Sequence, residues 1–205
     1  MQAETQRPVL AVFDFDGTLT DRHTFWRYMR FIHGPARFWL AMIPLLPKMA
    51  GVLLGLVPLM TARQAFIERY LKGLTVEQER EHARCFITEH LSQWLRPEAL
   101  RRLKWHQVQG HVTALVSNSP ENYLLPWGNL VGFDHVCGTR LATDKRGLNG
   151  AIDGRNCVER EKVTRLRACV GDLAHYDIYA YGDSSGDRDL LDVATFPSTA
   201  TGTDR

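Results

Sequence analysis

The sequence predicts an α/β fold, with a mostly parallel sheet at its core and an all-helical cap inserted after the first strand. Short apolar runs typical of buried strands are separated by longer segments with helical spacing of apolar residues. Strands that alternate with helices build a parallel sheet with helices on both faces, as in Rossmann-like domains. The predicted strands are residues 9–13, 111–117, 133–138 and 177–181.

The insertion lies between the first two predicted strands, and from residue 22 to about 109 the chain has a helical pattern almost throughout. Thr75 and Gln78 form a capping-box pattern that predicts the start of one helix, and Pro97 fits the first turn of another. The predicted organisation is therefore two parts. They are an α/β core of residues 1–20 and 100–205 and a helical cap of residues 21–99.

The second half of the chain returns to alternating elements. The segment "RLATDKRGLNGAI" predicts a hairpin with its turn in "DKRG". Residues 158–170 predict an amphipathic helix, because Val163, Leu166 and Val170 share one helical face. After the strand at 177–181, the polar turn that begins at Gly182 leads into a short helix.

The composition is that of an ordinary globular protein, with 205 residues, 44% hydrophobic, 23% charged and a formal net charge of +2. Arg and Lys are spread along the chain, so we expect no nucleic-acid partner. The four cysteines show no C-x-x-C pairing, which predicts neither a zinc cluster nor a disulfide framework. The N-terminus lacks the layout of a secretory signal, so a cytoplasmic protein is expected.

Polar residues follow the predicted strands at their carboxyl ends, where ligands bind in open α/β sheets. Asp14 and Asp16 follow the first strand, and because they are two positions apart they share one side of an extended chain. Ser117 and Asn118 follow the second, and Asp183 follows the last. We therefore expect these side chains to meet at one edge of the sheet.

Asp183 and Asp187 would add to the negative charge of the first two aspartates. A hard cation with oxygen ligands relieves such repulsion, and Mg²⁺ suits a few carboxylates together with a phosphate. The phosphate would need donors on its far side, such as Ser117, Lys162 and main-chain N–H groups near Asn118. With phosphate and Mg²⁺ present, one of the first two aspartates can attack phosphorus while the other transfers protons.

The segments "DFDGTLT", "VSNS", the lysine of "EREKV" and "GDSSGD" resemble, in this order, the four motifs of the haloacid dehalogenase-like phosphatase superfamily. The helical cap after the first strand is similar to its phosphoserine-phosphatase-like branch. The resemblance implies an Mg²⁺-dependent phosphomonoester hydrolase that forms an aspartyl-phosphate. The implied nucleophile is Asp14, and the implied general acid and base is Asp16.

The same resemblance implies further roles at the site. Ser117 and Lys162 bind the transferring phosphoryl group, with Asn118 beside them. Asp183 holds Mg²⁺ together with Asp14 and the main-chain carbonyl of Asp16, and Asp187 supports the metal or its water. Ser119, just before Pro120, is interpreted as a helix cap outside the catalytic set.

Two features depart from the resemblance. Phosphoserine phosphatases typically carry Glu nine positions after the nucleophile, where this chain has His23, so phosphoserine is not favoured as the substrate. Relatives usually continue with a strand and a helix after "LLDVA", whereas this chain ends in "TFPSTATGTDR", which we expect to be disordered.

Residues 38–60 form an apolar segment with one charge, Lys48, long enough to cross a membrane once. A single crossing would separate Asp14 from Lys162, which no enzyme with this site could tolerate. The favoured alternative is a buried helical hairpin that turns at Pro44 and Pro47. The other is an element that touches the membrane surface, which resembles the apolar cap of phosphatidylglycerol-phosphate phosphatases.

These alternatives give different functions. A buried hairpin favours a small phosphorylated metabolite as substrate, and a lipid-touching cap favours a lipid phosphate. A third possibility is a phosphate-binding module that has lost catalysis.

Overall fold

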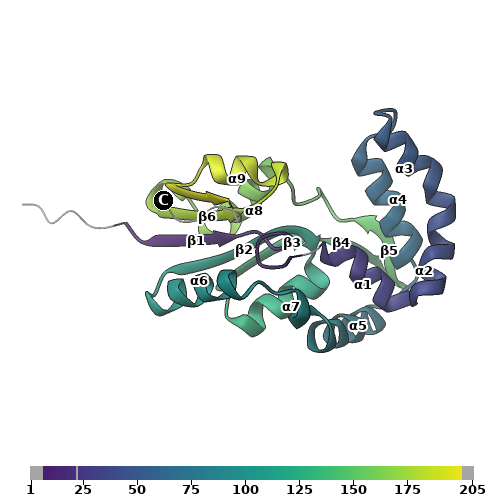
Figure 1. Ribbon diagram of the computed structural model, residues 1–205, viewed down its shortest axis with the longest axis horizontal. Coiled ribbons are helices and arrows are strands. Elements are labelled where there is room, and N and C mark those ends of the chain that lie inside the picture. Colours follow the sequence, from purple (N-terminus) through teal and green to yellow (C-terminus); the bar gives the residue numbers. More distant parts are fainter. Residues whose placement is uncertain (1–6, 22, 200–205) are drawn as a thin grey trace, which may run out of the picture.

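In the computed structural model of the protein, which describes residues 7–21 and 23–199, five strands form one parallel sheet (Figure 1). The strand order is β3-β2-β1-β6-β7, and each neighbouring pair is parallel. The strands are β1 (Val9–Phe13), β2 (Val112–Pro120), β3 (His135–Thr139), β6 (Asp177–Gly182) and β7 (Phe196–Thr199). The predicted fold class is confirmed, and the strand that precedes Asp14 lies in the middle of the sheet.

Helices cover both faces of the sheet, which explains why β1 is apolar at every position. Leu10 and Val12 pack into a core on one side, and Ala11 and Phe13 pack into a larger core on the other. All four side chains are buried. Figure 1 shows α8 (Arg160–Val170) and α9 (Arg188–Asp192) over the first face, and α6 (Pro97–Val108) and α7 (Glu121–Val131) over the second.

The segment between β1 and β2 folds into the cap helices. They are α1 (Thr24–His33), α2 (Pro35–Met42), α3 (Leu46–Leu53), α4 (Leu59–Leu71) and α5 (Val76–Glu89), with the short 3-10 turns η1 (Ile43–Leu45) and η2 (Leu91–Trp94). The larger core continues from the sheet into these helices through Phe25, Tyr28 and Phe86. The predicted capping box opens α5, since Thr75 Oγ1 accepts from the Gln78 N–H at 3.1 Å.

The predicted hairpin is confirmed and links the core to the cap. It consists of β4 (Leu141–Asp144) and β5 (Gly147–Ile152), and β5 packs against α4. The Gln64 side chain donates to the Gly150 carbonyl at 2.6 Å, and the Gly73 N–H donates to the Leu148 carbonyl at 2.9 Å. These contacts attach α4 to the α/β part of the chain.

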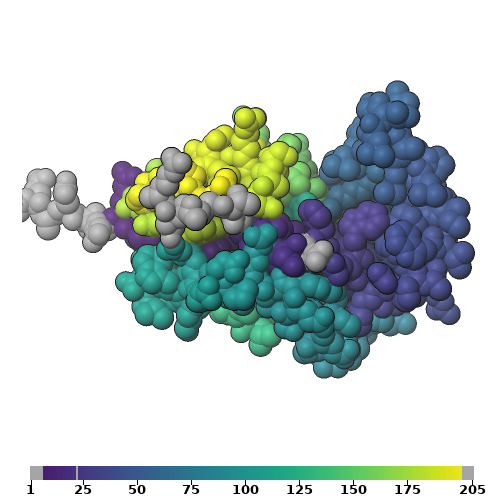
Figure 2. All heavy atoms as spheres, viewed as in Figure 1, coloured from purple at the N-terminus to yellow at the C-terminus, as the bar shows by residue number. Residues whose placement is uncertain are grey.

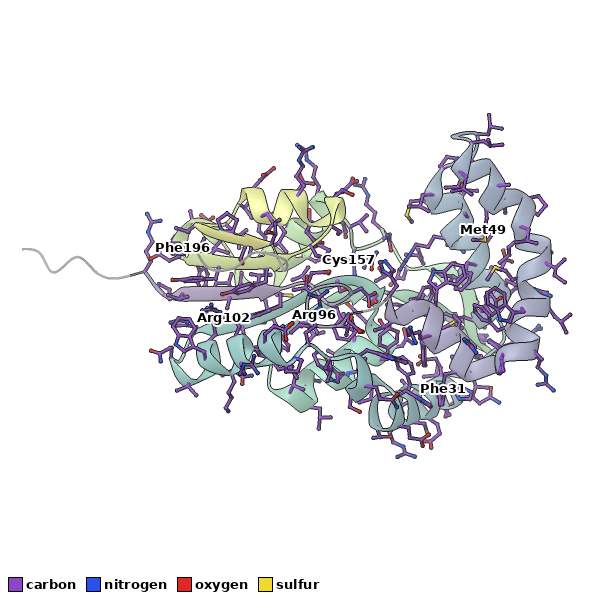
Figure 3. The ribbon with its side chains drawn as sticks, in the orientation of Figure 1. Phe31, Met49, Arg96, Arg102, Cys157 and Phe196 are labelled. Carbon is purple, nitrogen blue, oxygen red and sulfur yellow. The ribbon has the colours of Figure 1, made fainter. Side chains whose placement is uncertain are left out.

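The C-terminal segment differs from the expectation of disorder. Phe196–Thr199 form β7, which pairs with β6 at the edge of the sheet, so the expectation is wrong for these four residues. The Phe196 ring, labelled in Figure 3, stacks on Tyr179 with ring centres 4.5 Å apart. Pro197 is compatible with an edge strand, because only one side of such a strand donates hydrogen bonds to a neighbour. Residues 200–205 lie outside the described residues.

The apolar segment 38–60 is a helical hairpin, as predicted, but the prediction of burial is wrong. The chain does not reverse at Pro44 and Pro47, where the helical path continues through η1 into α3. It reverses between α3 and α4, at a turn in which Gly55 has φ of +71°. Much of the surface of this helical hairpin is exposed. The chain returns through α4, which contacts β5 of the β4–β5 hairpin.

Candidate active site

Three carboxylates gather at the carboxyl ends of β1 and β6. Asp14 follows β1, Asp183 follows β6, and Asp187 lies in the short turn η4 (Ser185–Asp187). One ligand oxygen from each lies within 4.8 Å of the others. Asp14 and Asp187 are buried and Asp183 is exposed, so the cluster opens to solvent on one side.

Lys162 reaches this cluster from α8. Its Nζ donates to Asp14 Oδ1 at 2.5 Å and also to Asp187 Oδ1. Burial alone would lower the pKa of Lys162, but the attraction of the Asp14 and Asp187 carboxylates is stronger. The net pKa of Lys162 is therefore raised, and its ammonium stays charged. Burial raises the pKa of Asp14 to about 7, against the attraction of Lys162 and with the help of the Asp187 charge.

The donor set fits Mg²⁺. It offers carboxylate oxygens only, and the three carboxylates exceed the one ammonium that contacts them, which leaves negative charge for a cation to balance. Burial followed by repulsion from Asp187 also raises the pKa of Asp183. Asp14, Asp183 and Asp187 are therefore the side chains that can hold the metal, and a cation among them would lower the raised pKa values.

Gly17 permits the loop after β1 to pass close to Asp183. A Cβ atom at position 17 would lie 1.9 Å from Asp183 Oδ2, and φ of Gly17 is +88°. Both facts require glycine at this position.

The side chain of Asp16 lies outside the carboxylate cluster. Asp16 Oδ1 accepts from the Thr24 N–H at 2.8 Å and from the Thr24 hydroxyl at 2.7 Å. Asp16 Oδ2 accepts from Ser119 Oγ at 2.8 Å. Thr24 belongs to the cap and Ser119 to β2, so Asp16 links these two parts. Because its side chain is engaged in this way, Asp16 would contribute to a metal through its main-chain carbonyl.

The interpretation of Ser119 as a helix cap is wrong. Pro120 occupies the cap position of α7, and no side chain caps that helix. Ser119 is the eighth residue of β2, two positions after Ser117, so both side chains point to the same side of the strand. The Tyr123 hydroxyl donates to Ser119 Oγ at 2.8 Å, which orients the serine toward Asp16.

Two of the three predicted phosphate ligands, Ser117 and Asn118, lie within the last residues of β2 rather than after it, because the strand extends to Pro120. Ser117 is fully buried, and its Oγ accepts from the Ser119 N–H at 3.2 Å. The main-chain carbonyl of Asn118 accepts from Thr139 Oγ1 at 2.7 Å and from Arg63 Nη2 at 2.5 Å. Asn118 thus joins the core to a side chain of the cap.

Arg63 is a site residue that the sequence reasoning missed. It belongs to α4, and its guanidinium also lies over the Phe25 ring, 5.2 Å from the ring centre. The Arg63 Nε–H is buried and has no hydrogen-bond partner among the described residues. A buried donor without a partner next to Asn118 is able to bind an anionic part of a ligand.

A cavity of about 620 Å³ lies in the cap between α1, α2 and η2. His23 lies at its edge, and the walls are aromatic and basic side chains with no acidic one among the described residues. His23 lies close enough to Asp183 that a positive charge on its ring would lower the pKa of that carboxyl, after the larger effect of Arg96.

The sequence matches a family model described as haloacid dehalogenase-like hydrolase over residues 11–192. The chain belongs to this family, as the four motifs predict. Protein CicA of Caulobacter vibrioides is 34% identical over 192 residues, which cover 91% of this chain and 83% of CicA. A histidinol-phosphatase of Neisseria meningitidis serogroup C is 29% identical over 137 residues, 64% of this chain and 60% of that protein.

Solved structures share the fold. A protein of unknown function from Bordetella pertussis Tohama I superposes with a TM-score of 0.81 at 22% identity, over 94% of this chain and 89% of that one. A substrate-bound phosphoserine phosphatase superposes with a TM-score of 0.64 at 18% identity, over 96% and 87% of the two chains. The predicted likeness to the phosphoserine-phosphatase branch is confirmed at the level of the fold.

Proposed function

We propose that the protein is a cytoplasmic, Mg²⁺-dependent phosphatase that hydrolyses a small phosphorylated metabolite through an aspartyl-phosphate. The observation that carries the proposal is the buried carboxylate of Asp14, held by Lys162 beside two further carboxylates. The names of two similar proteins, a histidinol-phosphatase and a phosphoserine phosphatase, support a phosphate monoester as substrate. His23, where phosphoserine phosphatases typically have Glu, favours a substrate other than phosphoserine.

In the proposed first step, an oxygen of Asp14 attacks phosphorus and the bond from phosphorus to the ester oxygen breaks. Asp16 gives its proton to the departing alcohol. In the second step, Asp16 takes a proton from the attacking water, and the bond between Asp14 and phosphorus breaks to release phosphate. Thr24 and Ser119 hold the Asp16 carboxyl group in one orientation, because they donate to its two oxygens.

Lys162 neutralises charge next to the nucleophile, and Ser117 and Asn118 donate to the phosphoryl oxygens. Mg²⁺, held by Asp14, Asp183, Asp187 and the main-chain carbonyl of Asp16, would neutralise developing charge on the transferring group. Residues 1–20 and 100–205 supply this chemistry in the proposed division of the chain. The cap of residues 21–99 selects the leaving group.

Arg63 is the cap residue best placed to contact the leaving group. We expect Arg63→Gln to raise KM about 10- to 100-fold with a smaller change in kcat, because a charged hydrogen bond to the substrate contributes about 1.5–3 kcal/mol. Steady-state kinetics with the best substrate of the wild-type protein measures both constants. Arg69→Gln, an exposed arginine on the same helix, is the matched control. An unchanged KM in Arg63→Gln would remove Arg63 from the substrate site.

The test of the function is phosphate release from a panel of phosphorylated metabolites, with Mg²⁺ and then with excess EDTA. The panel includes histidinol phosphate, phosphoserine and p-nitrophenyl phosphate. We expect turnover that disappears with EDTA and returns when Mg²⁺ is restored. No release from any substrate with Mg²⁺ would reject the phosphatase and favour a silent phosphate-binding module.

A second candidate substrate is a lipid phosphate, which the exposed apolar hairpin of the cap favours. Lysophosphatidic and phosphatidic acid in mixed micelles extend the same assay. Faster turnover of these lipids than of each soluble ester would replace the metabolite as the proposed substrate.

A further inference from the structure

The outer part of the cap exposes an unusual amount of apolar surface. Between residues 39 and 60, every residue that the structure leaves exposed is apolar; we call these exposed residues the apolar edge. At its far end Leu53, Leu54 and Leu56 are 89%, 72% and 78% exposed. Exposed apolar surface of this continuity marks a site of contact with a partner or a membrane.

The apolar edge lies on the outer helices of the cap. The most apolar 18 residues of the helical run Pro35–Leu53 have a mean hydropathy of 1.3, and only 17% of that stretch is buried. Figure 1 shows α2, α3 and α4 at the end of the molecule opposite the start of β1, and Figure 2 shows the turn between α3 and α4 projecting from the body. Met49, labelled in Figure 3, lies on α3 and is partly buried against the core.

The charge around the apolar edge has one sign. Between residues 38 and 67 the sequence contains Lys48 and Arg63 and no Asp or Glu, and Arg63 lies at the candidate active site rather than on the apolar edge. Arg37 is exposed at the start of the run and Lys48 is half-buried within it. The next acidic residue, Glu68, is paired with Lys72 at 2.9 Å, so its charge is balanced locally.

We infer that the apolar edge is a docking surface for an anionic lipid bilayer, on which the hairpin lies without crossing. Apolar side chains flanked by basic ones are the pattern of elements that lie in the membrane interface. The run does not continue across a bilayer, because the chain turns back through α4 and packs against β5 of the core.

A bilayer fits this surface better than a second copy of the chain. A symmetric pairing of two such surfaces would bring their basic flanks together, whereas anionic headgroups attract them. Stable protein interfaces are also enriched in aromatic residues and hydrogen bonds, whereas leucine is the most frequent residue of the apolar edge and Trp39 is its one aromatic residue. Leu40, Leu46 and Leu59 continue the leucine surface along the hairpin.

The test is sedimentation of the full chain with vesicles of phosphatidylglycerol and phosphatidylcholine, and with vesicles of phosphatidylcholine alone. The surface variant is Leu53→Glu with Leu56→Glu, and the matched control is Leu130→Glu, a leucine of α7 that is 72% exposed. We expect binding to the anionic vesicles, weakened by salt, and at least about tenfold weaker binding by the surface variant. The control variant should bind like the wild type.

Lack of binding to the anionic vesicles would overturn the inference, as would equal binding by the surface variant. Sedimentation velocity of the same proteins identifies the competing occupant. A dimer that the surface variant dissociates, together with no vesicle binding, would assign the apolar edge to a second copy. The binding assay requires no turnover, so its result does not depend on the proposed phosphatase activity.

Discussion

Asp14→Asn is expected to lower kcat for every phosphate ester by at least about 1,000-fold. An amide is a poor nucleophile and cannot form the aspartyl-phosphate, although it has almost the same shape as the carboxylate. The substitution also removes a charged partner of Lys162, whose Nζ lies 2.5 Å from Asp14 Oδ1. Phosphate release measures the loss, and acid-quenched wild-type protein should retain phosphate that the variant does not.

The matched control is Asp153→Asn, an exposed aspartate at the end of the β4–β5 hairpin. It should retain wild-type turnover. Thermal unfolding of both variants separates loss of chemistry from loss of folding. If folded Asp14→Asn turned over at the wild-type rate, the nucleophile would have to be another residue.

The parts of the site that can be read from the sequence are those in short motifs at strand ends. The order of the parallel strands brings Asp183, which follows β6, next to Asp14, which follows β1, whereas the side chain of Asp16 lies outside this carboxylate cluster. Local apolar runs also predict the strands themselves. These features depend on neighbours in the sequence or on general rules of parallel sheets.

Two contacts of the site could not be read in this way, because each joins elements that are distant in the sequence. Ser119 lies 103 positions from Asp16, and its role depends on β2 extending through Pro120. Arg63 lies 55 positions from Asn118 on a helix whose direction depends on the whole cap. Neither residue has a local signature that separates it from a surface serine or arginine.

The exposure of the hairpin illustrates a second limit. A run of apolar residues predicts that the chain avoids water but does not identify what covers the run. Residues 38–60 contain enough leucine for a buried hairpin. The side of α4 that faces the cap core, however, is the one that carries Phe66 and Tyr70. Packing of α4 on α1 and β5 therefore leaves the leucines outside.

Asp16→Asn is expected to slow the hydrolysis of alkyl phosphates and of p-nitrophenyl phosphate in different ways. A general acid and base contributes about 100- to 10,000-fold, so kcat for an alkyl phosphate should fall by that factor. Nitrophenolate departs without a proton, so the first step with p-nitrophenyl phosphate should be nearly unaffected. The second step still lacks its base, and a burst of one nitrophenol per enzyme should precede slow turnover in stopped-flow measurements.

Ser119→Ala separates the position of Asp16 from its chemistry. It removes the donor to Asp16 Oδ2 and leaves Thr24 on Oδ1, so the carboxylate stays but loses one of its two restraints. We expect the same pattern as for Asp16→Asn but a smaller effect, because the proton-transferring group is still present.

Equal losses on both substrates without a burst in Asp16→Asn would mean that this carboxylate acts before the leaving group departs, for instance by positioning the phosphoryl group.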